Sequence, residues 1–176
     1  MSEKYTLIIA AAGQGTRLKP LTNETPKSLL KVGNKSILEW QLSSIPKEYI
    51  SELIIIVGFQ SHQIKDEIEK LNLSYKVKFI YNDLYKECNC GYSFSLTRHI
   101  IHGPIIYINS DLIVKQHDLI NFLNDSHNDS LLINIDDIQH DDFLKGKIKR
   151  NDEMIYWPEY GYGEKGNCII VGPFKM

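Results

Sequence analysis

A series of short apolar runs, separated by helix-forming segments, limits the folds open to this chain. Leu53–Val57 reads Leu-Ile-Ile-Ile-Val and lacks the polar alternation of a strand with one face in water. Strands that are apolar on both sides are typical of a parallel sheet covered by helices on each face. Further buried strands are predicted at Tyr5–Ala10, Val77–Tyr81, Ile105–Asn109 and Leu131–Ile135.

Helices are predicted between these strands. Ser36-Ile37-Leu38-Glu39 matches a capping box, in which the serine and the glutamate satisfy free backbone donors of the first turn. Further helices are predicted at Ser61–Leu71, Ser93–Ile101 and Asp118–Leu123. This alternation predicts an open, mostly parallel α/β sheet. Lys145–Arg150 and Met154–Trp157 add a small β-hairpin region near the C-terminus.

Size and composition predict one soluble globular domain over residues 1–176. The chain is 43% hydrophobic and 24% charged, and 176 residues can bury a core. No run approaches the ~18 apolar residues of a membrane span. The N-terminus lacks the pattern of a secretory signal, and three cysteines do not form a disulfide framework. We therefore expect no membrane span and a cytoplasmic location.

The charge is unevenly distributed. The formal net charge of −2 argues against a nucleic-acid partner. Residues 1–35 hold six basic and two acidic side chains, so this segment carries +4 and the rest of the chain −6. Such a distribution favours a small polyanionic ligand near the N-terminal segment, with chance clustering on a solvated surface as the alternative.

The first strand leads into a loop that holds two glycines and two cations. Backbone N–H groups around Gly13 and Gly15 can approach a phosphate because glycine has no side-chain bulk. Arg17 offers a planar fork of donors and Lys27 a compact charge. The loop is not a P-loop, and Leu18 stands where a dinucleotide fingerprint needs its third glycine. Taken alone, each cation would be read as a solvated surface group.

The loop also carries longer motifs. Ala11–Thr22 reads Ala-Ala-Gly-x-Gly-Thr-Arg-Leu-x-Pro-Leu-Thr, and Pro26–Val32 reads Pro-Lys-Ser-Leu-Leu-x-Val. These strings resemble the nucleotidyltransferases that activate sugar 1-phosphates or phosphorylated alcohols. The resemblance implies a Rossmann-like three-layer sandwich, Mg²⁺ as cofactor, and transfer of a nucleotidyl group from an NTP to a phosphate monoester with release of pyrophosphate. It also implies a role in making precursors of cell-surface polysaccharides.

The resemblance assigns roles to individual residues. Arg17 would bind the leaving pyrophosphate and Lys27 the reacting centre, as the two catalytic residues. The nucleotide-binding residues of the loop would be Ala11, Ala12, Gly13, Gly15 and Thr16. Asp111 follows the fourth strand and corresponds to the family's acidic metal ligand, with a helix or turn cap as the alternative. Because the carboxyl ends of parallel strands share one edge, Asp111 and the glycine loop should lie on the same rim.

Two segments bear on the substrates. Asn82-Asp83-Leu84-Tyr85 and Asn89-Cys90-Gly91-Tyr92-Ser93 look like the corresponding stretches of phosphocholine cytidylyltransferase-like members. This likeness implies that Asn89 and Ser93 bind the nucleobase or ribose. It favours CTP and a phospho-alcohol such as phosphocholine over UTP or dTTP and a sugar 1-phosphate. An aromatic cluster could enclose a quaternary ammonium or simply pack a hairpin; its members are Tyr156, Trp157, Tyr160 and Tyr162.

Several alternatives stay open. The chain is C-terminally short for the family, so it is expected to be a fragment, a domain of a larger protein or a minimal enzyme. The alternative function is a non-catalytic or partner-dependent nucleotide-binding module, with a homo-oligomer or an additional domain as the partner. Cys88-x-Cys90 and His99-x-x-His102 are expected to be ordinary buried thiols and surface or core-edge histidines. A loop of Asp136, Asp137, Asp141 and Asp142 is expected to be solvated rather than a second metal contact.

Overall fold

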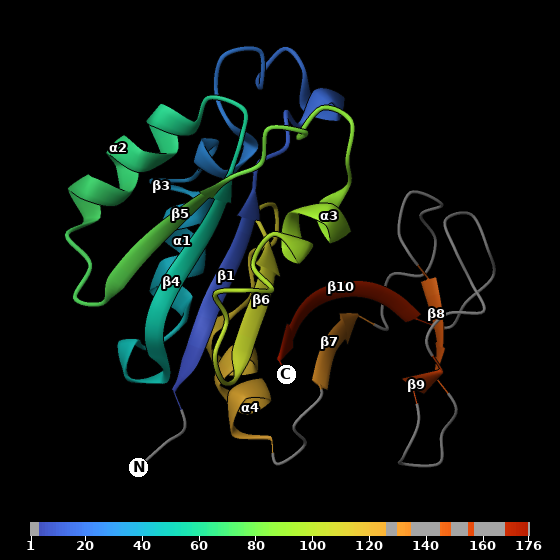
Figure 1. Cartoon of the computed structure of the whole chain (residues 1–176). Helices are drawn as coiled ribbons and strands as arrows, with labels where there is room; N and C mark the ends of the chain where they lie inside the picture. Colours follow the sequence, from blue (N-terminus) through green and yellow to red (C-terminus); the bar gives the residue numbers. More distant parts are fainter. Residues whose placement is uncertain (1–3, 126–129, 135–144, 149–154, 157–167, 176) are drawn as a thin grey trace.

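Four parallel strands form the centre of the molecule (Figure 1). The computed structural model describes residues 4–125, 130–134, 145–148, 155–156 and 168–175. The parallel strands are β1 (Tyr5–Ala11), β4 (Ile50–Val57), β5 (Lys76–Tyr81) and β6 (Ile105–Asn109). Their order is β5-β4-β1-β6, so the first strand of the chain lies between β4 and β6. The predicted α/β, Rossmann-like fold is confirmed.

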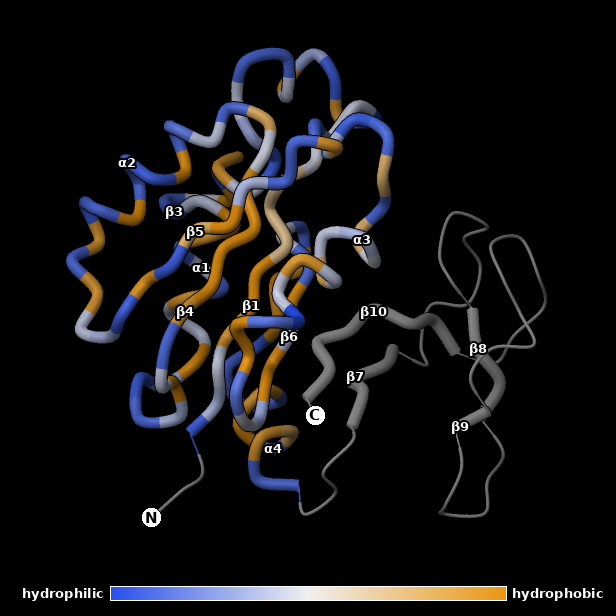
Figure 2. The backbone as a smooth tube through the Cα atoms, in the orientation of Figure 1, coloured by the Kyte–Doolittle hydropathy of each residue, from blue (hydrophilic) through white to orange (hydrophobic). Residues whose placement is uncertain are grey.

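Alternate side chains of the central strands pack on opposite faces of the sheet. Leu7 and Ile55 lie in one apolar cluster, Ile8 and Ile54 lie in the other, and all four are fully buried. The first cluster is covered by α1 (Ile37–Ser44), α2 (Ser61–Leu71) and α4 (Gln116–Asn124). The second is covered by α3 (Cys90–Ser95) and the segment after it. This arrangement gives three layers. The most hydrophobic residues lie along the central strands (Figure 2).

The C-terminal strands run against the parallel sheet. β10 (Cys168–Lys175) pairs antiparallel with β6, and β7 (Ser130–Asn134) pairs antiparallel with β10. The strand predicted at Leu131–Ile135 therefore exists as β7, but it does not extend the parallel sheet as the alternation predicted. The apolar run indicated a strand without specifying its partner, and β10 occupies the place beside β6.

The predicted hairpin region is present as an antiparallel pair. β8 (Lys145–Ile148) lies against β9 (Ile155–Tyr156), with Ile148 opposite Ile155. The residues that join these two strands lie outside the described part of the chain. The pair continues the sheet beyond β10, so the antiparallel strands extend it on the side of β6.

The sequence predicts the start of α1 correctly and the bounds of α3 wrongly. Ser36 Oγ accepts a hydrogen bond from Glu39 N at 3.1 Å, and the Glu39 carboxylate accepts one from Ser36 N, which confirms the capping box. The backbone N–H of Ser36, followed by Lys31, lowers the pKa of Glu39 to about 2. The helix predicted at Ser93–Ile101 is wrong in its bounds. It begins at Cys90, because Asn89 caps it, and ends at Ser95.

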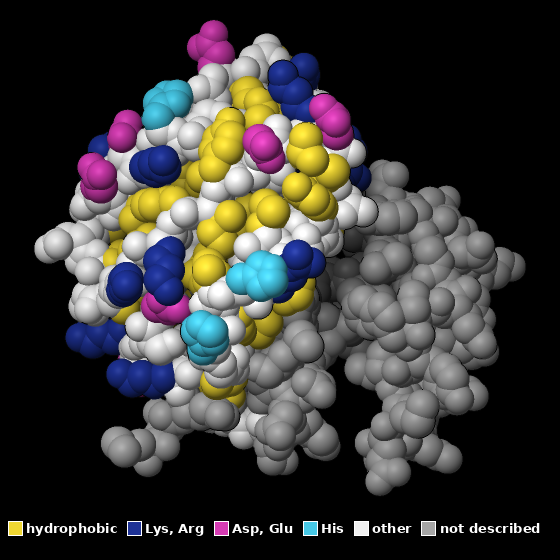
Figure 3. All heavy atoms as spheres, in the orientation of Figure 1, with side chains coloured by type: hydrophobic (Ala, Val, Ile, Leu, Met, Phe, Trp, Pro, Cys, Tyr) yellow, Lys and Arg dark blue, Asp and Glu magenta, His cyan; other side chains and the backbone are white. Residues whose placement is uncertain are grey.

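Three 3-10 turns and a small hairpin lie between the main helices and strands of the described chain. The 3-10 turns are η1 (Thr16–Leu18), η2 (Lys27–Leu29) and η3 (Lys47–Tyr49), and a small hairpin joins β2 (Lys31–Val32) to β3 (Lys35–Ser36). Among the described residues, none of the helices has both the length and the apolar character that crossing a membrane demands. Figure 3 shows side chains of both charge signs around exposed apolar atoms on one face.

Candidate functional site

A cavity of about 270 Å³ opens beyond the carboxyl ends of β1 and β6. Strand β1 pairs with β4 along one of its edges and with the later strand β6 along the other. Ligands of open α/β sheets bind at this kind of switch point. The cavity is lined by Ala10, Ala12, Gly13, Gly15, Arg17, Lys27, Asn82, Tyr85, Cys88, Asn89, Cys90, Ser93, Asn109, Ser110 and Asp111.

The glycine loop folds back on itself. Thr22 Oγ1 donates a hydrogen bond to Gly15 O at 2.7 Å, and Gly15 has a left-handed backbone with φ +63°. A Cβ atom at Gly15 would lie 3.1 Å from both Lys27 Cβ and Thr22 Cγ2. A Cβ atom at Gly13 would meet nothing within 4 Å. Gly15 is therefore required by the fold of the loop and the position of Lys27, and Gly13 is the glycine that leaves room for a ligand.

Lys27 and Asp111 meet at the mouth of this cavity, although 84 positions separate them in the sequence. Lys27 Nζ lies 2.6 Å from Asp111 Oδ2, and the two side chains are 22% and 48% exposed. Lys27 begins η2, directly after Pro26, and Asp111 follows the end of β6. The structure thus brings together the two charged residues that the sequence placed on one rim.

Asp111 lies in a tight turn at the end of β6. Leu112 N donates to Asn109 O at 3.2 Å, which closes the turn around Ser110 and Asp111. Ser110 N donates to Ala10 O at 3.3 Å, which joins the turn to the end of β1. The carboxylate is therefore presented from a main chain that is bonded both within the turn and to the neighbouring strand.

The donor set at this rim fits a magnesium ion that is held together with a phosphorylated ligand. Among the described residues, no group of three or more His, Cys, Asp or Glu side chains could hold a metal by itself. Mg²⁺ is commonly bound by one or two carboxylates together with substrate phosphates. Asp111 supplies one such carboxylate beside the glycine loop. The described part of the site can therefore share a cation with a ligand, with Asp111 as the carboxylate.

The opposite wall of the cavity is built around Asn82, which the sequence analysis did not assign. Asn82 is fully buried, and its Nδ2 donates to Ser93 Oγ at 3.0 Å. Its Oδ1 accepts from Leu84 N, and its N–H donates to Val57 O. Asn82 therefore connects the end of β4, the loop after β5 and α3. The signals for it in the sequence were its place directly after a predicted strand and its position in the Asn82-Asp83-Leu84-Tyr85 stretch.

Asn89 and Ser93, the predicted contacts of the nucleobase or ribose, both line the cavity, but part of their bonding capacity is used within the protein. Asn89 Oδ1 accepts from the backbone N–H groups of Gly91 and Tyr92 and so caps α3. Ser93 is buried and accepts from Asn82. The amide NH₂ of Asn89 and the hydroxyl hydrogen of Ser93 are the donors that these side chains can offer to a ligand.

The cysteines are not the buried thiols that the sequence suggested. Cys88 is partly exposed, Cys90 is exposed at the start of α3, and both line the cavity. Tyr107 of β6 lies under the same region and donates to Asn109 Oδ1 at 3.2 Å. Burial raises the pKa of Tyr107, and Cys90 and Asp111 raise it further.

Close packing fixes Tyr85 at the cavity wall. A Cβ atom at Gly58 would lie 2.8 Å from Ala12 O and from Tyr85 Cβ. Phe59 N, next along the chain, donates to Ala12 O at 3.0 Å. Gly58 therefore allows the glycine loop, the end of β4 and the Tyr85 ring to approach one another.

Two predicted nucleotide-binding residues lie away from the cavity lining. Ala11 is 3% exposed and pairs with Val57 between β1 and β4, so its side chain belongs to the core. Thr16 is exposed at the start of η1. His99 and His102 are exposed, in agreement with the surface interpretation. The acidic loop from Asp136 to Asp142 lies outside the described residues, as do the side chains of the aromatic cluster.

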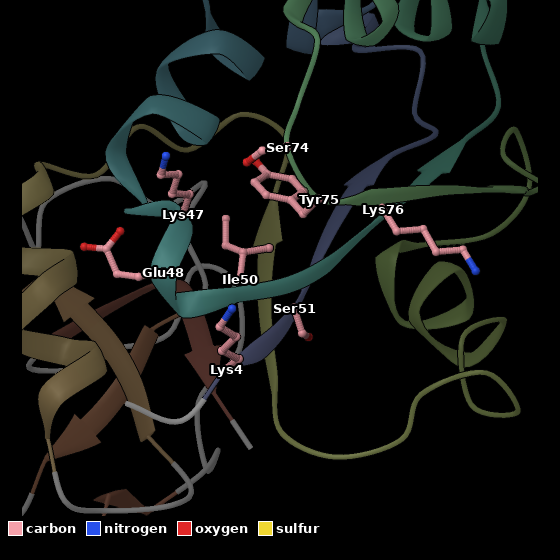
Figure 4. Close-up of a pocket in the computed structure, with 8 residues that line it drawn as sticks. All are labelled: Lys4, Lys47, Glu48, Ile50, Ser51, Ser74, Tyr75 and Lys76. Carbon is pink, nitrogen blue, oxygen red and sulfur yellow. The ribbon is translucent and has the colours of Figure 1, made fainter. Parts of the chain in front are cut away.

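A second cavity, of about 490 Å³, lies at the opposite edge of the sheet (Figure 4). It is lined by Lys4, Lys47, Glu48, Ile50, Ser51, Ser74, Tyr75 and Lys76, near the amino ends of β1, β4 and β5. In Figure 4 the charged ends of Lys47, Glu48 and Lys76 point away from one another. This cavity therefore lacks the convergence of polar groups that marks the first one.

Comparison with known proteins gives a family match that covers most of the chain. A family model described as nucleotidyl transferase matches residues 6–141. A choline-phosphate cytidylyltransferase of Streptococcus pneumoniae is 40% identical over 91 residues, which are 52% of this chain and 38% of the relative. A bifunctional protein GlmU of Methanococcus aeolicus is 30% identical over 169 residues, 96% of this chain and 39% of the relative. The chain thus spans less than half of the length of either relative.

A solved structure extends this similarity to the fold. The inositol-1-phosphate CTP transferase from T. maritima superposes with a TM-score of 0.77 at 18% sequence identity. The superposition covers 98% of this chain and 70% of the other. At this identity the match concerns the arrangement of helices and strands, and it includes the C-terminal part of the chain.

Proposed function

Because the chain belongs to the nucleotidyl transferase family, we propose that it transfers a nucleotidyl group from a nucleoside triphosphate to a phosphate monoester and releases pyrophosphate. The observation that carries this proposal is the Lys27–Asp111 pair at 2.6 Å, beside the glycine loop and at the switch point of the sheet. A pair this exposed contributes only about 0–1 kcal/mol to stability.

The reaction brings a phosphate dianion against the α-phosphorus of a triphosphate, so the protein must offset repulsion and align the groups. Arg17 and Lys27 both line the cavity and supply positive charge. We assign Arg17 to the leaving pyrophosphate and Lys27 to the reacting centre. Gly13 leaves room for the triphosphate to approach the backbone. No general base is required because the attacking phosphate is already an anion.

Asp111 is the residue that would hold Mg²⁺. A bound Mg²⁺ would neutralise charge on the triphosphate and polarise its phosphoryl oxygens. The protein's own contribution is to hold the Asp111 carboxylate at the rim, where Lys27 Nζ lies within 2.6 Å. Lys27 would bind the phosphate groups of the ligand from the same rim, and its positive charge would add to that of the cation.

We propose CTP as the preferred nucleotide, and phosphocholine or a sugar 1-phosphate as the acceptor. The support is the similarity to a choline-phosphate cytidylyltransferase, whose name states its substrate class, together with the positions of Asn89 and Ser93 in the cavity. The aromatic residues between Tyr156 and Tyr162 are candidates for the acceptor side. A chain that makes activated precursors for cell-surface polysaccharides would act in the cytoplasm, where nucleoside triphosphates are available.

A pyrophosphate-release screen tests the proposal. Four NTPs are each combined with phosphocholine or a common sugar 1-phosphate, in the presence of Mg²⁺. Lys27→Met should abolish release in the active pairing. Lys31→Met is the matched control, because Lys31 also forms an ion pair, with Glu39 at 3.0 Å, but does not line the cavity.

The outcomes separate the alternatives. Nucleotide binding without release in every pairing would refute the enzyme proposal for this chain and favour a partner-dependent binding module. A strongest signal with UTP or dTTP and a sugar 1-phosphate would refute the preference for CTP. Undiminished release by Lys27→Met would remove Lys27 from the reacting centre.

A further inference from the structure

Gln41 bonds to the main chain on both sides of Asp111. It lies on α1 and is 2% exposed. Its Nε2 donates to Asn109 O and to Leu112 O, each at 2.7 Å. These two carbonyls begin and end the turn that contains Ser110 and Asp111. One buried amide therefore spans the turn that presents the carboxylate to the cavity.

The chemistry of the contacts fixes the orientation of this amide. Both neighbours at 2.7 Å are carbonyl oxygens, and only the NH₂ group of a glutamine can donate to two acceptors. Gln41 Oε1 has no hydrogen-bond partner among the described residues, although it is buried. Leaving a buried oxygen unsatisfied costs free energy, which an apolar side chain of the same size would avoid. The two donated bonds are thus the specific contribution of a glutamine at this position.

The turn has three attachments that together set the place of Asp111. Ser110 N joins it to β1, the Asp111 carboxylate meets Lys27, and Gln41 joins it to α1. Asn109 O accepts from both Leu112 N and Gln41 Nε2, so the closing bond of the turn and the contact with α1 share one oxygen. Loss of the Gln41 bonds would leave Leu112 O without this donor and Asn109 O with the Leu112 N–H alone, so the turn would be free to rotate, with Asp111 at its centre.

We propose that Gln41 is a positioning residue for the cation-binding carboxylate: it clamps the 109–112 turn so that Asp111 faces the bound nucleotide. The proposal rests on the function proposed above, in which Asp111 holds Mg²⁺. Replacing a residue that orients a metal ligand typically weakens metal binding by about 10–100-fold. Gln41 should therefore control the affinity for the cation much more than the affinity for the nucleotide alone.

The test measures Mn²⁺ binding by electron paramagnetic resonance, with the nucleoside triphosphate that the wild-type chain binds most tightly and without an acceptor. Gln41→Met keeps the length of the side chain and removes both donors. It should raise the dissociation constant for Mn²⁺ by about 10–100-fold. Calorimetry without metal should show a nucleotide affinity within about threefold of wild type, since Gln41 does not line the cavity.

Leu38→Ala is the control for general destabilisation. Leu38 is fully buried on the same helix, and no side-chain bond joins it to the turn. This variant should lose thermal stability and keep the wild-type affinity for Mn²⁺. If Gln41→Met does not fold, Gln41→Asn replaces it, because a side chain one carbon shorter cannot reach both carbonyls. Wild-type Mn²⁺ affinity in the folded Gln41 variant would overturn the proposal.

An Asp111→Asn variant separates the two levels of the inference. If it loses Mn²⁺ binding and the Gln41 variant does not, only the positioning role fails. If both variants bind Mn²⁺ as tightly as wild type, the metal role of Asp111 fails, and the positioning role fails with it. Weakened binding in both, with unchanged metal-free nucleotide affinity in the Gln41 variant, supports both roles.

Discussion

Two glycines with nearly the same backbone conformation allow a sharp test of how Lys27 is placed. Gly15 has φ +63° and Gly33 has φ +67°. A Cβ atom at Gly15 would lie 3.1 Å from Lys27 Cβ, whereas a Cβ atom at Gly33 would meet nothing within 4 Å. Replacing each by alanine imposes the same backbone strain, and only the change at Gly15 also crowds Lys27. The difference between the two variants therefore reports the crowding at Gly15, which involves Lys27 and Thr22.

The expected stability changes follow from these contacts. A left-handed alanine costs about 1–2 kcal/mol, and about 0.4–1 kcal/mol returns because alanine restricts the unfolded chain. Gly33→Ala should therefore lower the free energy of unfolding by no more than about 1.6 kcal/mol, or about 3–6 °C in Tm. Gly15→Ala should lose about 1–3 kcal/mol more through overpacking.

The effect on turnover should be larger at Gly15. Relief of a 3.1 Å contact requires a shift of a few tenths of an ångström, which Lys27 or Thr22 must make. A misplacement of about 1 Å at a reacting centre costs up to about 100-fold, so Gly15→Ala should lose about 3- to 10-fold in kcat. Gly33→Ala should keep wild-type kcat. Thermal unfolding and pyrophosphate release measure both quantities, and equal kcat values for the two variants would refute a role of Gly15 in placing Lys27.

Three further predictions concern separate contacts. Gly13→Ala should leave Tm within about 2 °C of wild type, because its Cβ atom meets nothing within 4 Å; it should weaken nucleotide binding more than about tenfold, or 1.4 kcal/mol, by calorimetry. Gly58→Ala should cost about 1–3 kcal/mol in chemical denaturation, since its Cβ atom would lie 2.8 Å from Tyr85 Cβ; an unchanged denaturation midpoint would contradict this packing. Glu39 has a pKa lowered from 4.5 to about 2, so its contribution is present above pH 4.5 and is lost as the pH falls from 4.5 to 2. Glu39→Gln should flatten the fall in stability over that interval, and an unaltered pH profile would argue against the capping contact.

The parallel core could be predicted because its signal is local. Leu53–Val57 is apolar at every position, and burial on both faces follows directly from that pattern. The direction of β7 could not be predicted in the same way, because it depends on β10, which comes more than thirty residues later in the chain. The start of α3 was missed because Gly91 in its first turn counts against a helix, while the cap at Asn89 outweighs it.

Of the candidate site, only residues near a recognisable motif or the end of a predicted strand could be placed from the sequence. Lys27 and Asp111 could be placed on one rim because each follows a recognisable motif or strand. Gln41 could not be assigned, because its importance lies in bonds to distant parts of the chain. Gln41 donates to carbonyls 68 and 71 positions away, and carbonyls are present at every residue. No local pattern distinguishes such a glutamine from one that faces solvent.

The position of β1 has a consequence for how the protein acquires its site during synthesis. β1 leaves the ribosome before β4 and β6, yet it pairs with both of them. The ion pair between Lys27 and Asp111 spans nearly the same interval. A nascent chain that stops before Asp111 therefore has its glycine loop but no complete rim. Nucleotide binding by chains stalled at increasing lengths would report when this sheet closes, and long-range pairing of this kind is slow relative to local folding.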